Sequence, residues 1–227
     1  MIPFGSIVNA LSVIGGSLIG LSFGNLLPKP IRSIIFEVMG VFTLVLGLKM
    51  SLETQEFIVL LLSLTMGAAI GEKLNIENKL QILGEKIKRI LKSKNEKFAE
   101  GLVTAFLLYC IGSMTFVGAI EEGINHDRTL LYTKSFMDGI TSILLASSFG
   151  LGVLVSAVPL LIFQSILTFA ALYLEPHLTS GIINEISAVG GVLIICIGIN
   201  ILEFKKIKVS NMLPSLFLVV PIYLIFS

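Results

Sequence analysis

Long apolar runs, separated by short polar gaps, extend along the whole chain. No charged residue occurs in residues 1–28, 101–120, 139–174 or 209–227. A helix needs about 20 predominantly apolar residues to cross the hydrocarbon core of a bilayer. Because lipid offers backbone groups no hydrogen-bond partner, such segments satisfy their own backbone by forming helices. The pattern therefore predicts an all-α, polytopic transmembrane helical bundle.

We predict about eight spanning helices, with seven as the alternative. They cover residues 3–25, 31–52, 56–73, 98–120, 130–148, 151–174, 182–202 and 210–226. The fourth contains Gly112, Ser113, Thr115 and Gly118, and it can instead break and re-enter, as is tolerated where protein covers the backbone. The first lacks the basic start and the cleavage site of a signal peptide, so we expect it to span as well.

The gap between the third and fourth predicted helices is rich in basic residues. They are Lys73, Lys79, Lys86, Lys88, Arg89, Lys92, Lys94 and Lys97. By the positive-inside rule this gap is cytoplasmic, and the protein lies in the cell membrane. Eight helices then place the basic turns at 29–32 and 205–208 inside, whereas Glu175 and both chain ends face outward. Seven helices would put the 205–208 turn on the wrong face, so the charges favour eight.

Within this gap, residues 75–97 carry an amphipathic helical pattern. Apolar residues recur at three- and four-residue steps, at Ile76, Leu80, Leu83, Ile87, Ile90 and Leu91. Such a helix can lie on the anionic inner leaflet, with its basic side chains near the lipid headgroups. The alternative is a helix that covers the cytoplasmic end of the bundle.

The second and seventh predicted helices share a glycine spacing. Gly40 and Gly47 correspond to Gly191 and Gly198, at an offset of 151 residues (191 minus 40). Helices one to three therefore resemble helices six to eight, and the two helices between them would invert the second trio, a plan common in transporters. The predicted segments are a three-helix repeat (1–74), the amphipathic segment (75–97), a central helix pair (98–150) and the second repeat (151–227). The alternative is a chance alignment of glycine-containing apolar helices.

Composition excludes a soluble domain and gives no sign of several other classes of protein. Hydrophobic residues make up 55% of the chain and charged residues 14%, whereas soluble domains carry about 25% charged residues. A net charge of +1 and the absence of Trp give no sign of nucleic-acid binding. No phosphate-binding loop occurs, and His126 and His177 lie in turns without metal-ligand spacing. We expect no cofactor and no metal, and no enzymatic activity because no nucleophile stands beside a base.

Glycines also form ladders in the first and third predicted helices. Glycine at every fourth position lets two helix backbones approach closely in a membrane. The glycines that we expect to pack helices are Gly16, Gly20, Gly24, Gly67, Gly71, Gly40, Gly47, Gly191 and Gly198.

Asp138 lies well inside the fifth predicted helix, where a charged side chain is expensive. Lys134 lies one helical turn earlier, and Ser142 lies one turn later. One interpretation is a structural ion pair of Lys134 with Asp138, although Lys before Asp is the weaker order in an isolated helix. The other is a carboxylate in a hydrated cavity that binds a cation or titrates.

Other polar residues extend the candidate site. Glu121 and Glu122 follow a segment rich in Gly, Ser and Thr that includes Thr115, and hydroxyls beside carboxylates suit a small cation. The alternative for this segment is a solvated outer turn. Three uncharged polar residues lie at membrane depth, where they bond across helices or contact a substrate, namely Asn9, Gln164 and Asn200.

Four segments resemble those of the YqgA/YdfK-like family of bacterial membrane proteins, also described as domain of unknown function 554. The segments are VNALSVIGGSLIG, GSMTFVGAIEEG, KSFMDGITSILLASSFGLGV and AVGGVLIICIGIN. The resemblance extends nearly from end to end. It implies a multi-pass protein of the bacterial cytoplasmic membrane, and it implies no settled activity.

Two functions fit these patterns. The first is a small secondary transporter or a cation- or proton-coupled carrier, with a midplane site around Asp138, Glu121 or Glu122, Asn9 and Asn200. The second is a non-transporting membrane scaffold or subunit, in which glycine ladders mediate assembly and the basic segment recruits a cytoplasmic partner. The expected partners are the lipid bilayer and a small solute or ion, and a homo-oligomer is compatible with the sequence.

Overall fold

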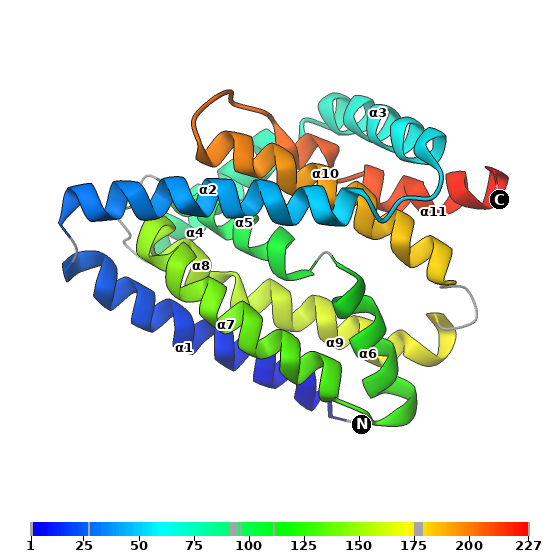
Figure 1. The fold of residues 1–227 in the computed structure, drawn as a ribbon, viewed down its shortest axis with the longest axis horizontal. Coiled ribbons are helices and arrows are strands. Elements are labelled where there is room, and N and C mark those ends of the chain that lie inside the picture. The colour runs from blue at the N-terminus through cyan, green and yellow to red at the C-terminus, as the bar shows by residue number, and fades with distance from the viewer. Residues whose placement is uncertain are drawn as a thin grey trace. The chain divides into compact units, whose positions relative to one another are not determined.

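Helices make up nearly all of the chain. The computed structural model describes residues 2–26, 28–90, 95, 97–110, 112–174 and 179–226, without the side chains of residues 23–26, 29, 32, 35, 36, 113 and 174. The described residues contain no strand, which confirms the predicted all-α class (Figure 1). Their helices are α1 (Phe4–Leu26), α2 (Lys29–Ser51), α3 (Phe57–Leu74), α4 (Ile76–Ile90), α5 (Phe98–Cys110), α6 (Ser113–Asn125), α7 (Thr129–Phe149), α8 (Leu151–Val155), α9 (Ala157–Leu174), α10 (Ser180–Ile201), the 3₁₀ helix η2 (Val209–Met212) and α11 (Ser215–Phe226).

Glycines mark two of the helix breaks. Gly112, with φ 152° and ψ 150°, separates α5 from α6, and Gly150, with φ 72°, separates α7 from α8. Side chains with a Cβ rarely adopt either conformation, so glycine is required at both positions. The fourth predicted helix is therefore broken, as the alternative prediction allowed.

Five described helices or helix combinations are long and apolar enough to cross a membrane. They are Phe4–Ser22, Phe57–Leu74, Leu151–Tyr173, Ser180–Ile201 and Val209–Phe226, and the pair α5 and α6, bent by 58°, makes a sixth if it forms one span. Helices α2 and α7 have 23 and 21 residues and are not among them. Polar side chains, including Lys134 and Asp138, lower the hydropathy of α7. A total of eight spanning helices requires that α5 and α6 form one span and that α2 and α7 also span. It stays a prediction.

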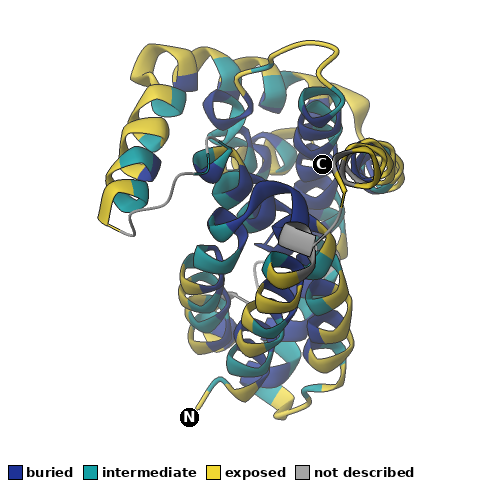
Figure 2. Ribbon diagram, turned by 90° about the vertical axis from the view of Figure 1, so that its left-hand side faces the viewer, coloured by how far each residue is buried: buried dark blue, intermediate teal, exposed yellow. Residues whose placement is uncertain are grey.

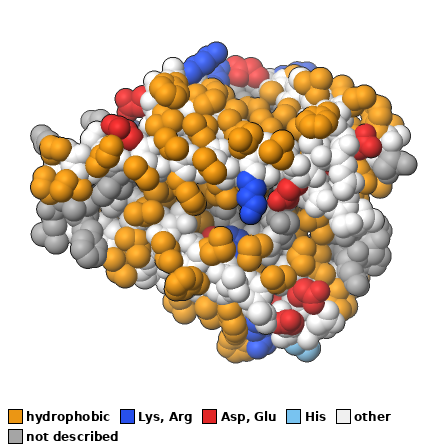
Figure 3. Space-filling view, in the orientation of Figure 1, with side chains coloured by type: hydrophobic (Ala, Val, Ile, Leu, Met, Phe, Trp, Pro, Cys, Tyr) orange, Lys and Arg blue, Asp and Glu red, His pale blue; other side chains and the backbone are white. Residues whose placement is uncertain are grey.

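Apolar side chains remain on the surface of the protein. Phe136 in α7 is 71% exposed, and Phe217 in α11 is 78% exposed. Figure 3 shows hydrophobic side chains spread over much of one face, with few charges between them. Many helices have a buried side and an exposed side (Figure 2). Large exposed apolar areas indicate contact with lipid or protein.

The chain divides into two compact units, each made of two separate stretches. Unit 1 contains Met1–Ile35 and Lys88–Leu178, and unit 2 contains Phe36–Ile87 and Thr179–Ser227. Unit 1 thus holds α1 and α5 to α9, and unit 2 holds most of α2 and α4 together with α3, α10, η2 and α11. The units are defined by contacts between residues, whereas the four predicted segments were defined along the sequence. The units therefore do not test the segments, which stay a prediction.

In unit 1, α1 packs along α7 with their backbones in close contact (Figure 1). A Cβ atom at Gly16 would overlap the carbonyl oxygen of Gly139, and one at Gly20 would overlap that of Ile143. The surroundings of Gly24 lie outside the described part of the structure. Gly16 and Gly20 therefore lie at the contact between α1 and α7, where a packing ladder is predicted.

In unit 2, α2 and α10 cross at the glycines that suggested the repeat. A Cβ atom at Gly47 would lie 2.7 Å from the Gly191 oxygen, and a Cβ atom at Gly191 would lie 2.7 Å from the Gly47 oxygen. Gly40 faces Leu202, the residue that follows α10, whereas Gly47 faces Gly191 within α10, so the two helices run antiparallel. Equivalent helices of an inverted repeat must run antiparallel where they meet. The repeat itself stays a prediction.

The remaining predicted glycines also lie at contacts within unit 2. Gly198 faces Leu44 of α2, Gly67 of α3 faces Ser215 of α11, and Gly71 faces the backbone of Asn211. A side chain at any of these positions would displace a neighbouring helix or loop.

We expect Gly16→Ala to lower the stability of the protein by about 1–3 kcal/mol, because the added methyl group would force α1 away from α7. Gly15→Ala is a matched control, since no atom lies within 4 Å of a Cβ at Gly15. Thermal unfolding in detergent micelles measures both variants. Equal midpoints for the two variants would contradict the close backbone contact.

Candidate functional site

The candidate site centres on an ion pair in α7. Lys134 Nζ donates to both carboxylate oxygens of Asp138, at 2.9 Å to Oδ1 and 2.6 Å to Oδ2. The two side chains are 8% and 9% exposed. One helical turn separates the residues, so both side chains lie on the buried face of α7. The arrangement is the pair that the sequence predicted as one of its two interpretations.

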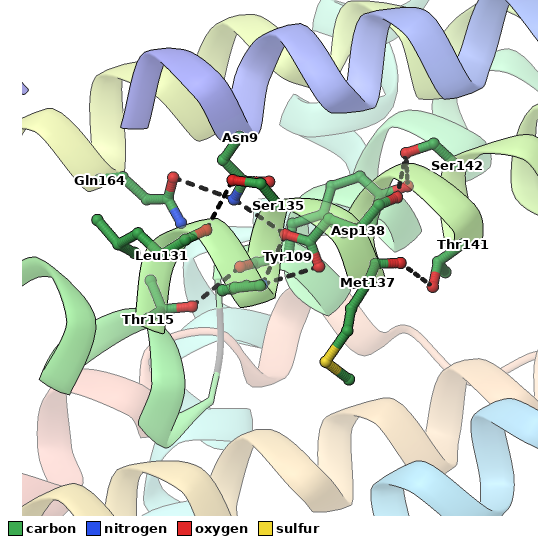
Figure 4. Close-up of polar contacts among 11 residues, drawn as sticks. Asn9, Tyr109, Thr115, Leu131, Ser135, Met137, Asp138, Thr141, Ser142 and Gln164 are labelled. Carbon is green, nitrogen blue, oxygen red and sulfur yellow. Dashed lines mark hydrogen bonds and ion pairs between the residues drawn. The ribbon is translucent and has the colours of Figure 1, made fainter. Parts of the chain in front are cut away.

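Two amide side chains from other helices complete the surroundings of Asp138. Asn9 of α1 donates its Nδ2 to Asp138 Oδ2 at 2.9 Å and to Gln164 Oε1 of α9 at 3.2 Å. Both amides are fully buried. Figure 4 shows Asn9 between Gln164 and Asp138. The structure thus brings together four of the predicted residues from three helices, namely Asn9, Lys134, Asp138 and Gln164.

A chain of hydroxyl groups extends from Asp138 to the break between α5 and α6. Ser142 Oγ donates to the carbonyl oxygen of Asp138 at 2.7 Å and lies 2.7 Å from the hydroxyl of Tyr109. Thr115 Oγ1 donates to the Tyr109 carbonyl oxygen at 3.1 Å, across the break (Figure 4). Thr115 therefore satisfies one of the carbonyl groups that the end of α5 leaves free.

Glu122 is buried at the beginning of α1. Its Oε1 accepts the backbone N–H of Gly5 at 2.7 Å, and Arg128 Nε lies 3.1 Å from the same oxygen. A carboxylate stabilises a helix N-terminus, where N–H groups lack intrahelical partners and the helix dipole is positive. Arg128 also lies over the ring of Phe4, 5.0 Å from its centre. Glu122 therefore holds the first turn of α1.

Glu121, its neighbour, plays no part in this contact. Its Oε2 accepts from Asn125 Nδ2 at 2.7 Å on the exposed side of α6. The two adjacent carboxylates, which the sequence treated as equivalent candidates, therefore have different surroundings.

Asn200 uses its amide group in unit 2. Its Nδ2 donates to the Ile207 carbonyl oxygen at 2.8 Å, and its Oδ1 accepts the Ile207 N–H at 2.7 Å. These bonds close the loop that follows α10. Asn200 belongs to unit 2, whereas Asp138 belongs to unit 1.

The sequence reasoning missed Glu185, a buried carboxylate in α10. It accepts hydrogen bonds from Thr54 Oγ1 at 2.7 Å and from the backbone N–H groups of Gln55 and Glu56 at 2.8 and 3.2 Å. Glu185 therefore stabilises the beginning of α3 in the way that Glu122 stabilises the beginning of α1. The available signal was a carboxylate within a long apolar run.

Seven buried side-chain atoms of unit 1 have no hydrogen-bond partner among the described residues. Two are Ser17 Oγ and Ser148 Oγ, and the other five are Ser6 Oγ, Asn9 Oδ1, Glu122 Oε2, Gln164 Nε2 and Thr168 Oγ1. A buried polar atom without a partner costs about 1–3 kcal/mol, so buried groups of this kind normally bind water or a ligand. Ser6 and Thr168 were not predicted, although each lies within one helical turn of a predicted amide.

Several residues named in the sequence analysis lie outside the described residues. These are Leu91, Lys92, Lys94, Glu175 and His177, together with the side chains of Lys29 and Arg32. Asp127, in the turn before α7, is described and exposed. It accepts hydrogen bonds from the N–H and hydroxyl of Thr129, at 2.9 and 2.7 Å, which hold the pKa of its carboxyl below the usual value.

We expect Lys134→Met to destabilise the protein by about 3–5 kcal/mol, because it leaves the buried Asp138 carboxylate without its cation. The double variant with Asp138→Asn should lose less stability than Lys134→Met alone, since no unpaired charge remains. Thermal unfolding of the single and double variants in detergent measures the coupling between the two residues. Additive losses would show that the pair does not hold together in the folded protein.

Comparison with known proteins places the chain in a family. Residues 4–224 match the family described as protein of unknown function (DUF554). An uncharacterized membrane protein YdfK from Bacillus subtilis (strain 168) is 37% identical over 217 residues, covering 94% of this chain and 92% of the relative. An uncharacterized protein YqgA from Escherichia coli (strain K12) is 31% identical over 223 residues, covering 96% of this chain and 95% of the relative. No solved structure matches the chain. The chain belongs to the DUF554 family, and its apolar helices make it a membrane protein of that uncharacterised family.

Proposed function

We propose that this protein is a small secondary transporter in which a coupling cation competes with the Lys134 ammonium for the Asp138 carboxylate. The observation that carries the proposal is a buried, hydrogen-bonded ion pair on an otherwise uncharged helix, beside amide atoms without partners. Ionisable residues at membrane depth are expensive, and in membrane proteins they commonly mark ion and substrate pathways.

The ion pair gives the proposed carrier two states. With Asp138 ionised, Lys134 Nζ occupies both carboxylate oxygens. A cation or proton that binds Asp138 neutralises the carboxylate and releases the ammonium, so the pair opens. Loss of that cation on the other side of the membrane restores the pair. The carrier thereby alternates between two arrangements that differ in the partner of one carboxylate.

Broken helices beside the site support a carrier. Transporters often build their sites from discontinuous helices, whose free backbone groups contact ions and substrates. Here the break at Gly112 is joined to Asp138 through Thr115, Tyr109 and Ser142. The antiparallel crossing of α2 and α10 is compatible with the inverted repeat that such carriers contain.

The charges orient the proposed carrier in the cell membrane. The positive-inside rule places residues 75–97 in the cytoplasm and both chain ends outside. Within this segment, α4 exposes Ile82 (48%), Leu83 (50%) and Ile90 (78%) among basic residues. An amphipathic basic helix of this kind lies on an anionic leaflet, so we place α4 on the inner surface of the membrane.

We expect a concentration jump of Na⁺ or H⁺ across proteoliposomes on a solid-supported membrane to displace charge in the wild-type protein. Asp138→Asn should reduce this displacement about a hundredfold, because it removes the group that the cation must neutralise. Asp127→Asn is the control, since it neutralises an exposed carboxylate and retains the oxygen that accepts from Thr129.

An unchanged signal in Asp138→Asn would remove this residue from the mechanism. If neither cation displaces charge and a second protein copurifies in fixed proportion, the non-transporting scaffold or subunit replaces the carrier as the better function.

A further inference from the structure

Five of the seven buried unit 1 atoms without partners lie on α1, α6 and α9, which pack against one another. We call Ser6, Asn9, Glu122, Gln164 and Thr168 the polar column. All five residues are buried, with exposed fractions of 0% for Ser6, Asn9, Glu122 and Gln164 and 2% for Thr168. Their free atoms include oxygen and nitrogen, and donors as well as acceptors. The column begins at Asp138, which Asn9 contacts, and ends at Glu122.

Contacts between helices fix the order of the column. Asn9 bonds to both Asp138 and Gln164, so these three residues lie at the same height along α1 and α9. At the other end, Gly5 donates to Glu122, and a Cβ at Gly123 would lie 2.5 Å from the Thr168 carbonyl oxygen. Glu122 therefore lies at the level of Gly5 and Thr168.

Ser6 and Thr168 occupy the positions between the two ends. Ser6 lies three residues before Asn9 on α1, and Thr168 lies four residues after Gln164 on α9, so each shares a face with its amide. Because α1 and α9 run in opposite directions, both hydroxyl groups lie on the Glu122 side of the amides. The column thus has an unpartnered polar atom at each level from Asp138 to Glu122.

The Asp138 carboxylate decides which amide atoms remain free. A carboxylate only accepts hydrogen bonds, so Asn9 must turn its NH₂ group toward Asp138. The same NH₂ group then bonds to the carbonyl oxygen of Gln164. This leaves the Asn9 oxygen as a free acceptor and the Gln164 nitrogen as a free donor.

A free donor beside a free acceptor selects water over a metal cation. Hard cations such as Mg²⁺ and Ca²⁺ are bound by oxygen ligands, and the Na⁺ ion follows the same electrostatic preference. An N–H group aimed into the site repels a cation. A water molecule can accept from the Gln164 nitrogen and donate to the Asn9 oxygen, and a neighbouring water can bond to the hydroxyls, so that each water has the two to four partners of a buried water.

We infer that the polar column binds a file of water that carries protons between Glu122 and Asp138, and that the coupling ion is therefore the proton. This inference rests on the proposed carrier function. Glu122 divides its two oxygens accordingly: Oε1 is held by Gly5 and Arg128, whereas Oε2 is buried and free. Arg128, 33% exposed, connects this end of the column to the solvent on the side that the proposed orientation places outside.

Each step in the column conserves charge and atoms. A proton from solvent forms an O–H bond on Glu122 Oε2, and the carboxyl passes it to the adjacent water as that bond breaks. Each water or hydroxyl takes one proton and releases another, until an O–H bond forms on Asp138. Neutral Asp138 then no longer holds the Lys134 ammonium. No oxidant, reductant or metal takes part.

The test uses charge displacement by the full chain in proteoliposomes, after a pH jump at constant Na⁺ and after a Na⁺ jump at constant pH. We expect a signal from the pH jump alone. Glu122→Gln should slow it about a hundredfold, since an amide cannot relay a proton, while the amide oxygen still accepts from Gly5. The double variant Ser6→Ala/Thr168→Val should also slow it, although it breaks no hydrogen bond among the described residues.

Matched controls separate this effect from a loss of folding. Ser63 and Ser187 also have buried hydroxyls without partners among the described residues, and both belong to unit 2, so Ser63→Ala/Ser187→Ala removes two such groups without changing the column. This variant should keep the wild-type rate, and thermal unfolding should be similar in both double variants.

The outcomes distinguish the two proposals. If the Na⁺ jump gives a signal in the wild-type protein and Asp138→Asn abolishes it, the carrier is retained and the proton column is overturned. A pH-jump signal that Asp138→Asn abolishes and Glu122→Gln leaves unchanged would overturn the column in the same way. The absence of any signal from either jump in the wild-type protein would overturn the carrier itself.

Discussion

Apolar surface alone cannot hold helices together in a bilayer, because lipid tails are as apolar as leucine side chains. Helices must therefore gain affinity from close backbone contact or from polar groups that find each other away from lipid. Both solutions occur in this chain. Gly16 and Gly20 bring α1 against α7, and Gly47 and Gly191 bring α2 against α10. The glycines bring the backbones close, and the polar residues then decide which helix faces which.

The dry environment also explains why buried carboxylates lie at the beginnings of helices. The first N–H groups of a helix have no intrahelical partner, and in a dry environment water does not satisfy them. Glu122 satisfies Gly5 at the beginning of α1, and Glu185 satisfies Gln55 and Glu56 just before α3. Each carboxylate belongs to another helix of its own unit, so each bond fixes two helices at once. Glu185 uses Oε1 for these N–H groups and Oε2 for the Thr54 hydroxyl, whereas Oε2 of Glu122 has no partner among the described residues.

The apolar runs predicted the helices well, because the need for about 20 apolar residues acts on each segment alone. The break at Gly112 was predictable as an alternative, since glycine and hydroxyl residues interrupt the run around it. The partners of polar residues were not predictable, because they depend on tertiary structure. Asn9 lies 129 residues from Asp138 and 155 from Gln164 along the chain, and their contact follows from the packing of α1 between α7 and α9. The separation of Glu121 from Glu122 has the same origin, since only one of two neighbouring positions on α6 faces α1.

The order of charges in α7 supports the proposed carrier over a purely structural role for the ion pair. Lys134 precedes Asp138 by one helical turn, and this order of the two charges is the weaker one in an isolated helix. The pair persists because both charges are buried and because Asn9 supplies a further bond to the carboxylate. A structural pair would be strengthened by the opposite order of residues. Such a pair can open when Asp138 gains a proton, because protonation removes the electrostatic attraction between the carboxylate and the Lys134 ammonium.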